Sequence, residues 1–82
     1  MKVLVVDDDR VLAEILAFTL QRLGLVVVQA FDGRSALQRW SEDTPDLIML
    51  DVNLPDMSGF DICRQIRQQA DVPIILLTVR GE

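Results

Sequence analysis

The stretch DLIMLDVNLP, residues 46–55, decides the fold of this chain. Its apolar run, residues 47–50, has no alternating polar side chains, which is typical of a strand buried on both faces of a parallel sheet. Asp51 follows this run directly. Because open α/β sheets bind their ligands beyond the carboxyl ends of their strands, Asp51 is predicted to lie at a ligand-binding edge.

A second stretch has the same form, since the apolar run VLVV, residues 3–6, leads directly into Asp7, Asp8 and Asp9. If the two strands are parallel neighbours, Asp7, Asp8 and Asp51 converge at one edge of the sheet. Three clustered carboxylates repel one another, and the arrangement is costly unless a cation or raised pKa values relieve it. Oxygen ligands without histidine or a cysteine cluster favour Mg²⁺, or Mn²⁺ as a substitute, over zinc.

Helical spacing begins after Asp9, which we interpret as the residue that introduces the first helix. Gly24 supplies a stop after Arg22. A short apolar strand is predicted over residues 25–30. The inward stripe of the first helix is predicted to be Leu12, Ile15, Leu16, Thr19 and Leu23.

Two more helices and a fourth strand complete the predicted pattern. Asp32 and Gly33 give a turn and an N-cap for a helix that ends at residues 43–45. Ser58 and Asp61 resemble a capping box, and residues 71–73 break the helix that follows. The run IILL, residues 74–77, is a buried-type strand. The apolar side chains expected along one side of these helices are Ala36, Leu37 and Trp40 on the second, and Phe60, Cys63 and Ile66 on the third.

The order β-α-β-α-β-α-β with short connections predicts a doubly wound α/β fold with a parallel sheet and helices on both faces. The 82 residues are half hydrophobic and 26% charged, which suits one domain, or the N-terminal part of one, over residues 1–82. The net charge of −5 argues against nucleic-acid binding by this segment. A lone cysteine, no apolar run of membrane-spanning length and no signal peptide favour a cytoplasmic location without membrane association.

Three motifs together identify a family. They are VVDDD at residues 5–9, DVNLPDMSG at residues 51–59 and LLT at residues 76–78. With these motifs, the chain resembles the receiver domain of two-component response regulators along its whole length. The resemblance implies a flavodoxin-like sheet of order 2-1-3-4-5 and a phosphorylation switch.

The resemblance also implies roles for individual residues. Asp51 would accept a phosphoryl group from a histidine kinase. Mg²⁺ would be held by Asp8, Asp51 and the backbone carbonyl of Asn53, with Asp7 helping through water. The hydroxyl of Thr78 would bond the phosphoryl oxygens and shift on activation.

The sequence departs from the family pattern at its end. It stops at Glu82, so the expected sheet order is 2-1-3-4 with the fifth strand missing, and no output domain is expected. The lysine that the family carries after strand five has no counterpart, because Lys2 is the only lysine. Strand four would become an apolar edge, which predicts a homodimer or higher oligomer through that edge. Without a neighbouring fifth helix, the residues of the first helix expected to be exposed are Val11, Ala17 and Phe18.

Two other functions stay open at this point. A truncated receiver without working phosphorylation could act only as a dimerisation or structural fragment. A Mg²⁺-dependent phosphohydrolase of the aspartyl-phosphate kind is less favoured, because such enzymes usually have a second Asp two residues after the nucleophile, where this chain has Asn53. Otherwise the domain is not an enzyme, beyond its own phosphorylation and dephosphorylation.

Overall fold

The structure, a computed structural model, describes residues 1–77 of the chain. Strands and helices alternate in the predicted order, and each strand begins and ends within one residue of its predicted bounds. None of the helices in the described part is long and apolar enough to cross a membrane. The elements are β1 (Lys2–Val6), α1 (Arg10–Arg22), β2 (Val26–Ala30), α2 (Gly33–Asp43), β3 (Leu47–Asp51), α3 (Gly59–Arg67) and β4 (Ile74–Leu77).

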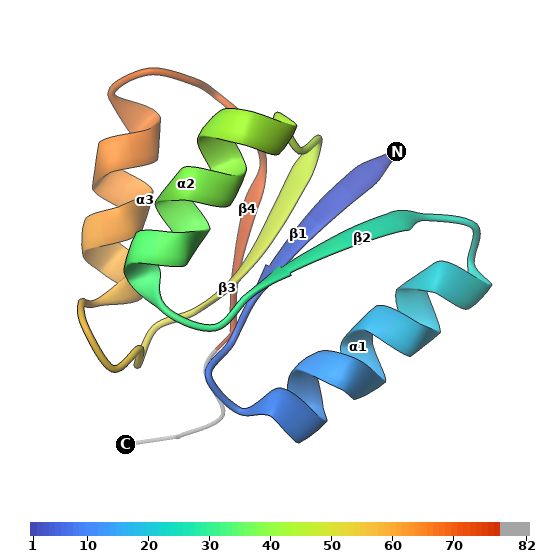
Figure 1. Ribbon diagram of the computed structural model, residues 1–82. Helices are drawn as coiled ribbons and strands as arrows, with labels where there is room; N and C mark the ends of the chain where they lie inside the picture. Colours follow the sequence, from blue (N-terminus) through green and yellow to red (C-terminus); the bar gives the residue numbers. More distant parts are fainter. Residues whose placement is uncertain (78–82) are drawn as a thin grey trace.

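All four strands are parallel, and their order across the sheet is β2-β1-β3-β4. Val6 is paired in register with Ala30 on one side and with Leu50 on the other. The carboxyl ends of β1 and β3 therefore lie at the same level. One face of the sheet carries α1, and the other carries α2 and α3 (Figure 1). The predicted doubly wound, flavodoxin-like arrangement is confirmed.

The main core lies between the sheet and the two helices α2 and α3. Its fully buried members are Leu4, Val6, Ala30, Ala36, Ile48, Leu50, Ile62 and Ile66. Because side chains alternate along a strand, Val3 and Val5 face α1 instead, and they are also fully buried. The corresponding residues of β3, Leu47 and Met49, are only half-buried, since α1 packs against β1 and β2. The prediction of burial on both faces is therefore correct for β1 and only partly correct for β3.

The buried face of α1 differs from the predicted stripe. Ala13 and Ala17 are buried in it, so the expected exposure of Ala17 is wrong. The small alanine side chains let the helix approach the sheet closely. Val11 and Phe18 are exposed as expected. Three members of the predicted stripe are also on the surface: Ile15, Thr19 and Leu23.

Only the serine half of the predicted capping box is present at the start of α3. The Oγ atom of Ser58 accepts a hydrogen bond from the backbone N–H of Phe60 at 3.1 Å. The Asp61 carboxylate pairs with Arg64 on the same helix instead of returning to Ser58. Oppositely charged residues three positions apart are neighbours on a helix surface, and this pair competes with the cap.

The inward side of α3 is formed by Ile62 and Ile66, which lie four residues apart and are both fully buried. Phe60 is 50% exposed, so its predicted place on the inward side is wrong. Cys63 is half-buried and packs against the core beside Ile66.

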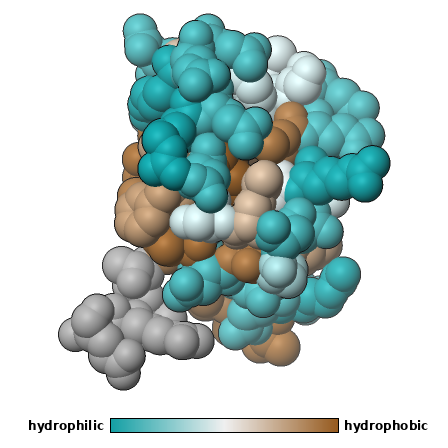
Figure 2. Space-filling view, turned by 90° about the vertical axis from the view of Figure 1, so that its left-hand side faces the viewer, coloured by the Kyte–Doolittle hydropathy of each residue, from teal (hydrophilic) through white to brown (hydrophobic). Residues whose placement is uncertain are grey.

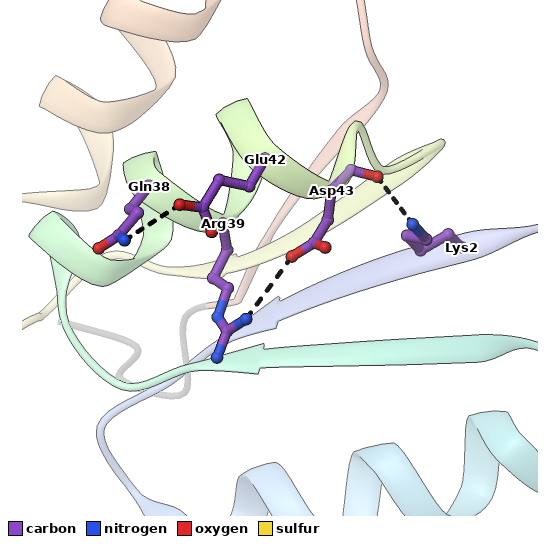
Figure 3. Close-up of polar contacts among 5 residues, drawn as sticks. All are labelled: Lys2, Gln38, Arg39, Glu42 and Asp43. Atoms are coloured by element: carbon purple, nitrogen blue, oxygen red, sulfur yellow. Dashed lines mark hydrogen bonds and ion pairs between the residues drawn. The ribbon is translucent and has the colours of Figure 1, made fainter.

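The only lysine of the sequence, Lys2, lies at the amino end of β1. Its Nζ donates a hydrogen bond to the carbonyl oxygen of Asp43, the last residue of α2, at 2.9 Å. Figure 3 shows this contact beside the ion pair of Asp43 with Arg39, which spans 3.8 Å. The backbone N–H of Lys2 donates to the carboxylate of Asp46 at 2.8 Å. Lys2 is therefore held at the end of the sheet opposite to the clustered aspartates.

One edge of the described sheet is formed by β4. Among residues 1–77, this strand pairs with β3 alone. Ile75 is 48% exposed and Leu76 is 37% exposed. Figure 2, viewed from the side on which α3 lies, shows apolar side chains at the surface between the hydrophilic upper part and the grey residues. The predicted apolar edge is present in this part of the chain.

Candidate functional site

Three carboxylates meet beyond the carboxyl ends of β1 and β3. Asp7 and Asp8 follow β1, and Asp51 is the last residue of β3. Each of these side chains offers one carboxylate oxygen, and the three oxygens all lie within 4.8 Å of one another. The register that places Val6 opposite Leu50 brings the two acidic segments to the same edge. The structure thus brings together the three aspartates that the strand pattern predicts to converge.

Asp7 is the buried member of the group, with 3% of its surface exposed. Its backbone N–H continues the sheet by donating to the carbonyl oxygen of Ala30 at 3.1 Å. Its Oδ1 accepts a hydrogen bond from the backbone N–H of Asp9 at 3.0 Å. The side chain is therefore fixed at the floor of the site, whereas Asp8 is exposed at its rim.

Asp9 belongs to the helix rather than to the cluster. Its Oδ1 accepts hydrogen bonds from the backbone N–H groups of Val11 and Leu12, each at 3.1 Å. These two bonds satisfy donors that would otherwise have no partner at the start of α1. The interpretation of Asp9 as the residue that introduces the first helix is confirmed.

Burial raises the pKa of the Asp7 carboxyl above its ordinary value, and it is the largest cause of the shift. The hydrogen bond from Asp9 acts in the opposite direction, and the negative charges of Asp51, Asp8 and Asp9 raise the pKa further. The cluster therefore holds its negative charge at a cost. A divalent cation placed among these oxygens would offset that cost.

The loop of residues 52–58, which we call the β3–α3 loop, follows Asp51 and supplies the remaining wall of the site. The Oδ1 atom of Asp51 accepts a hydrogen bond from the backbone N–H of Asn53 at 3.3 Å. Gly59 donates its N–H to the carbonyl oxygen of Val52 at 2.8 Å, and Asn53 pairs with Ser58 in an isolated antiparallel bridge. The base of the loop is therefore closed just beyond the acidic cluster.

The acidic cluster opens into a cavity of about 190 Å³. A larger hollow, of about 490 Å³, lies between α1 and Gln29 of β2, and among the described residues that line it only Glu14 is titratable. Thr78, the predicted switch residue, lies outside the described residues, although Leu77 before it borders the cavity at the cluster. The residues that line this cavity are Asp7, Asp8, Asp9, Leu12, Asp51, Asn53 and Leu77.

The donor set at the cluster fits Mg²⁺. Carboxylate oxygens are hard ligands, and Mg²⁺ usually takes one or two protein carboxylates and keeps several waters. No His is present in the sequence, and its single Cys, at position 63, packs against the core on α3. The ligands that a zinc site would need are therefore missing from the cluster.

The β3–α3 loop also contains a contact that the sequence analysis missed. The carboxylate of Asp56 accepts hydrogen bonds from the backbone N–H groups of Gly33 and Arg34. These partners lie more than twenty residues away in the sequence, and no local pattern singles out Asp56 as their acceptor. The predicted start of a helix indicates that its first backbone N–H groups need acceptors, but the sequence does not indicate which residue supplies them.

Replacing Asp7 by Asn is expected to stabilise the metal-free protein by a few degrees in melting temperature and to weaken Mg²⁺ binding. The amide removes a charge that burial and neighbouring aspartates penalise, while its oxygen can still accept the bond from Asp9. Thermal unfolding with and without Mg²⁺ measures both effects, since an ion that binds only the folded state raises the melting temperature. A lower melting temperature for metal-free Asp7→Asn would contradict this account.

The raised pKa of Asp7 also determines how its contribution to stability changes with pH. Because the folded pKa of Asp7 lies above the ordinary value of 3.8, the folded state binds the proton more tightly than the unfolded state does. As pH falls through the folded pKa toward 3.8, the contribution of Asp7 to the free energy of unfolding rises. Affinity for Mg²⁺ falls over the same window, because the proton competes with the metal. The stability advantage of Asp7→Asn is therefore expected to be largest at neutral pH and to shrink in acid.

Comparison with known proteins gives a consistent result. The family model of the response regulator receiver domain matches residues 3–82. A probable transcriptional regulator, ycf27, from Guillardia theta is 42% identical over 81 residues. The match covers 99% of this chain and 32% of that protein, so the chain spans about a third of the length of this curated relative.

Solved structures show the same likeness. The chemotaxis response regulator CheY4 of Vibrio cholerae is 38% identical, with a TM-score of 0.93 over 99% of this chain and 70% of that one. The response regulator TrrA from Thermotoga maritima, solved in complex with Mg²⁺ and BeF, is 36% identical, with a TM-score of 0.92. That match covers 98% of this chain and 70% of the other.

Proposed function

Because this chain belongs to the response regulator receiver domain family, we propose that it is a phosphorylation switch whose acceptor is Asp51. The observation that carries the proposal is the meeting of Asp51 with Asp7 and Asp8, whose oxygens lie within 4.8 Å of one another at the edge of one cavity. A lone aspartate at the end of a strand would be an ordinary turn residue. An acceptor beside two further carboxylates is suited to a metal-assisted transfer of a phosphoryl group.

The proposed reaction is a single displacement at phosphorus. A carboxylate oxygen of Asp51 attacks the phosphorus atom of the donor and forms an acyl phosphate. The bond between phosphorus and the leaving nitrogen or oxygen breaks, and the leaving group takes the electron pair. Such a transfer depends on alignment and charge neutralisation more than on acid–base catalysis. The half-buried position of Asp51 beside an open cavity supports this role.

The residues proposed to hold Mg²⁺ are Asp8, Asp51 and the backbone carbonyl of Asn53, with Asp7 acting through water. Bound Mg²⁺ would supply positive charge to the transferred phosphoryl group and help to orient it. The buried charge of Asp7, whose pKa is raised, and the closed base of the β3–α3 loop support this assignment. The relative TrrA, solved with Mg²⁺ and BeF, supports the choice of metal.

A histidine kinase is the proposed phosphoryl donor, and Thr78 is the proposed residue that responds to the phosphoryl group. Both assignments rest on the resemblance of the motifs, which include LLT at residues 76–78. The relative ycf27, a probable transcriptional regulator, is about three times as long as the matched region. We propose that an output such as DNA binding belongs to a segment other than these 82 residues, whose net charge is −5.

A dimerisation fragment without phosphorylation is the second candidate, and the apolar edge that β4 forms among residues 1–77 favours it. A phosphohydrolase is less favoured, since the Asn53 side chain at the cavity is an amide and cannot act as an acid or a base.

Intact mass measurement separates the three functions. The chain is incubated with Mg²⁺ and acetyl phosphate, a small phosphodonor that needs no kinase. A switch is expected to show one phosphoryl adduct that requires Mg²⁺. A phosphohydrolase would release phosphate continuously at enzyme-like turnover, and a purely structural fragment would show neither an adduct nor Mg²⁺ binding.

We expect the 82-residue chain on its own to self-associate at micromolar concentration through the edge of β4. Among residues 1–77, the strand exposes apolar side chains and pairs with β3 alone, and pairing of two such edges would bury the side chains and satisfy the backbone groups. Sedimentation should show dimers or higher oligomers for the wild type and a shift toward monomer for Ile75→Lys. Phe60→Lys, which changes an exposed apolar residue on α3, is the matched control and should leave the distribution unchanged. A well-folded wild-type monomer would contradict the prediction.

A further inference from the structure

The tip of the β3–α3 loop is hydrogen-bonded to the start of α2 through the carboxylate of Asp56. Asp56 accepts a hydrogen bond from the backbone N–H of Gly33 at 2.7 Å through Oδ1 and another from Arg34 at 3.0 Å through Oδ2. The next backbone donor of the helix, Ser35, is bonded at 2.7 Å to Asp32, the N-cap residue. The first three donors of α2 are therefore satisfied by two carboxylates, one from the helix itself and one from the loop.

The electrostatics of this contact favour a charged Asp56. The two backbone N–H groups of Gly33 and Arg34 are the largest causes that lower the pKa of its carboxyl below the ordinary value. The start of a helix carries a partial positive charge, which adds to the attraction for an anion. The contact therefore favours the charged form of Asp56, which accepts both hydrogen bonds.

A second contact holds the loop at the same place. A Cβ atom added to Gly33 would collide with the Cγ and Sδ atoms of Met57 and would lie 3.1 Å from Oδ1 of Asp56. Met57 is half-buried and packs against the main core. The Met57 side chain thus lies directly against the backbone of Gly33, and a larger residue at position 33 would require this side chain to move.

Asn53 lies in the chain between Asp51, at the base of the loop, and Asp56, at its tip. This residue is exposed, and its described attachments are the 3.3 Å bond from its N–H to Asp51 and the bridge to Ser58. Only two residues separate Asn53 from Asp56, and a chain this short has little slack. A shift of Asp56 would therefore be passed to Asn53 and to the acceptor Asp51.

We propose that Asp56 is a positioning residue for the metal site: by fastening the loop tip to the start of α2, it holds the backbone of Asn53 and the Asp51 side chain in place for a divalent cation. The inference rests on the proposed function, which assigns Asn53 and Asp51 to that cation. It adds a residue that touches neither the metal nor the phosphoryl group. Such outer contacts orient the ligands that bind a metal directly.

The test compares Asp56→Ala with Asp32→Ala in the full 82-residue chain. Both variants remove a carboxylate that bonds the same helix start, but only Asp56 belongs to the loop. Mn²⁺ serves as the probe, and the electron paramagnetic resonance signal of the free ion gives its dissociation constant whatever the oligomeric state. Loss of an outer contact typically weakens metal binding by about 10–100-fold, and we expect a rise of about 5–10-fold in the dissociation constant for Asp56→Ala, because the contact acts through the loop. Asp32→Ala should change it less than about 2-fold by the same reasoning.

Hydrogen exchange measured by mass spectrometry gives a second readout that needs no metal. Peptides that contain the N–H groups of Asn53 and Gly59 should exchange faster in Asp56→Ala than in Asp32→Ala. Each variant is measured the same number of degrees below its own melting temperature, so that a difference in global stability does not decide the comparison. Asp56→Asn, which keeps one oxygen acceptor, should recover part of the affinity.

The outcomes separate this inference from the proposed function. A wild-type chain that does not bind Mn²⁺ would overturn both. A wild type that binds Mn²⁺, with equal affinities in Asp56→Ala and Asp32→Ala, would overturn the inference alone, because Asp56 would then be only a helix cap. Equal hydrogen exchange in the loop of the two variants would overturn it as well.

Discussion

Asp51→Asn is expected to reduce the phosphoryl adduct formed with Mg²⁺ and acetyl phosphate to background. The change replaces the attacking carboxylate by an amide of nearly the same shape, which is not a nucleophile at neutral pH. Asp51 lies at the end of β3, and the amide can still accept the 3.3 Å bond from Asn53. The fold and the loop should therefore survive, and the loss of the adduct reports the chemistry alone.

Asp46→Asn is the matched control, because Asp46 precedes the same strand at its amino end and its carboxylate bonds the backbone of Lys2. This variant should form the adduct as the wild type does. Melting temperatures of the two variants establish that both are folded. An adduct that persists in Asp51→Asn and disappears in Asp8→Asn would move the acceptor to Asp8 and refute the assignment.

The meeting of Asp51 with Asp7 could be predicted because it depends on patterns that are local in the sequence. Each aspartate follows an apolar run, and parallel strands bring such ends to one edge. The acceptor therefore follows from the strand order and needs no knowledge of side-chain packing. The same reasoning gave the place of Asp9, whose two bonds to the start of α1 are made within three residues.

The errors in the prediction of α1 concern which side of a helix faces the sheet. Ile15 is 56% exposed and Ala17 is buried, the reverse of what their hydrophobicity suggests. Close approach of helix and sheet selects small side chains for the contact, and hydrophobic periodicity does not measure that distance. The prediction that Asp61 completes a capping box with Ser58 is wrong for a different reason. A charged neighbour, Arg64, offers the Asp61 carboxylate a competing partner.

Asp56 shows the limit of local patterns more clearly. Its partners, Gly33 and Arg34, become neighbours only when α2 and the β3–α3 loop are placed on the same side of the sheet. Asp56 is exposed, as is usual for a carboxylate in a loop between a strand and a helix. What it bonds is a property of the assembled fold.

Gly59→Ala is expected to lower the free energy of unfolding by about 2–3 kcal/mol, near the upper end of what overpacking usually costs. A Cβ at this buried position would collide with the carbonyl oxygen of Asp51 and would lie 2.9 Å from Cα of Val52. Both obstacles are backbone atoms, which cannot rotate away as a flexible side chain can. For a domain of this size, that loss corresponds to a fall in melting temperature of about 8–24 °C.

Ser58→Ala is the control for this collision. It removes the cap at the same helix start without adding an atom near β3. It should cost about 1 kcal/mol, the usual loss for a capping serine. Thermal unfolding and Mn²⁺ titration are to be measured on both variants under conditions in which each is folded. Because the added methyl group presses on the residue that carries the acceptor, Gly59→Ala should lose both stability and metal affinity, whereas Ser58→Ala should lose mainly stability. Equal losses in the two variants would mean that the close contact between Gly59 and Asp51 does not fix the acceptor.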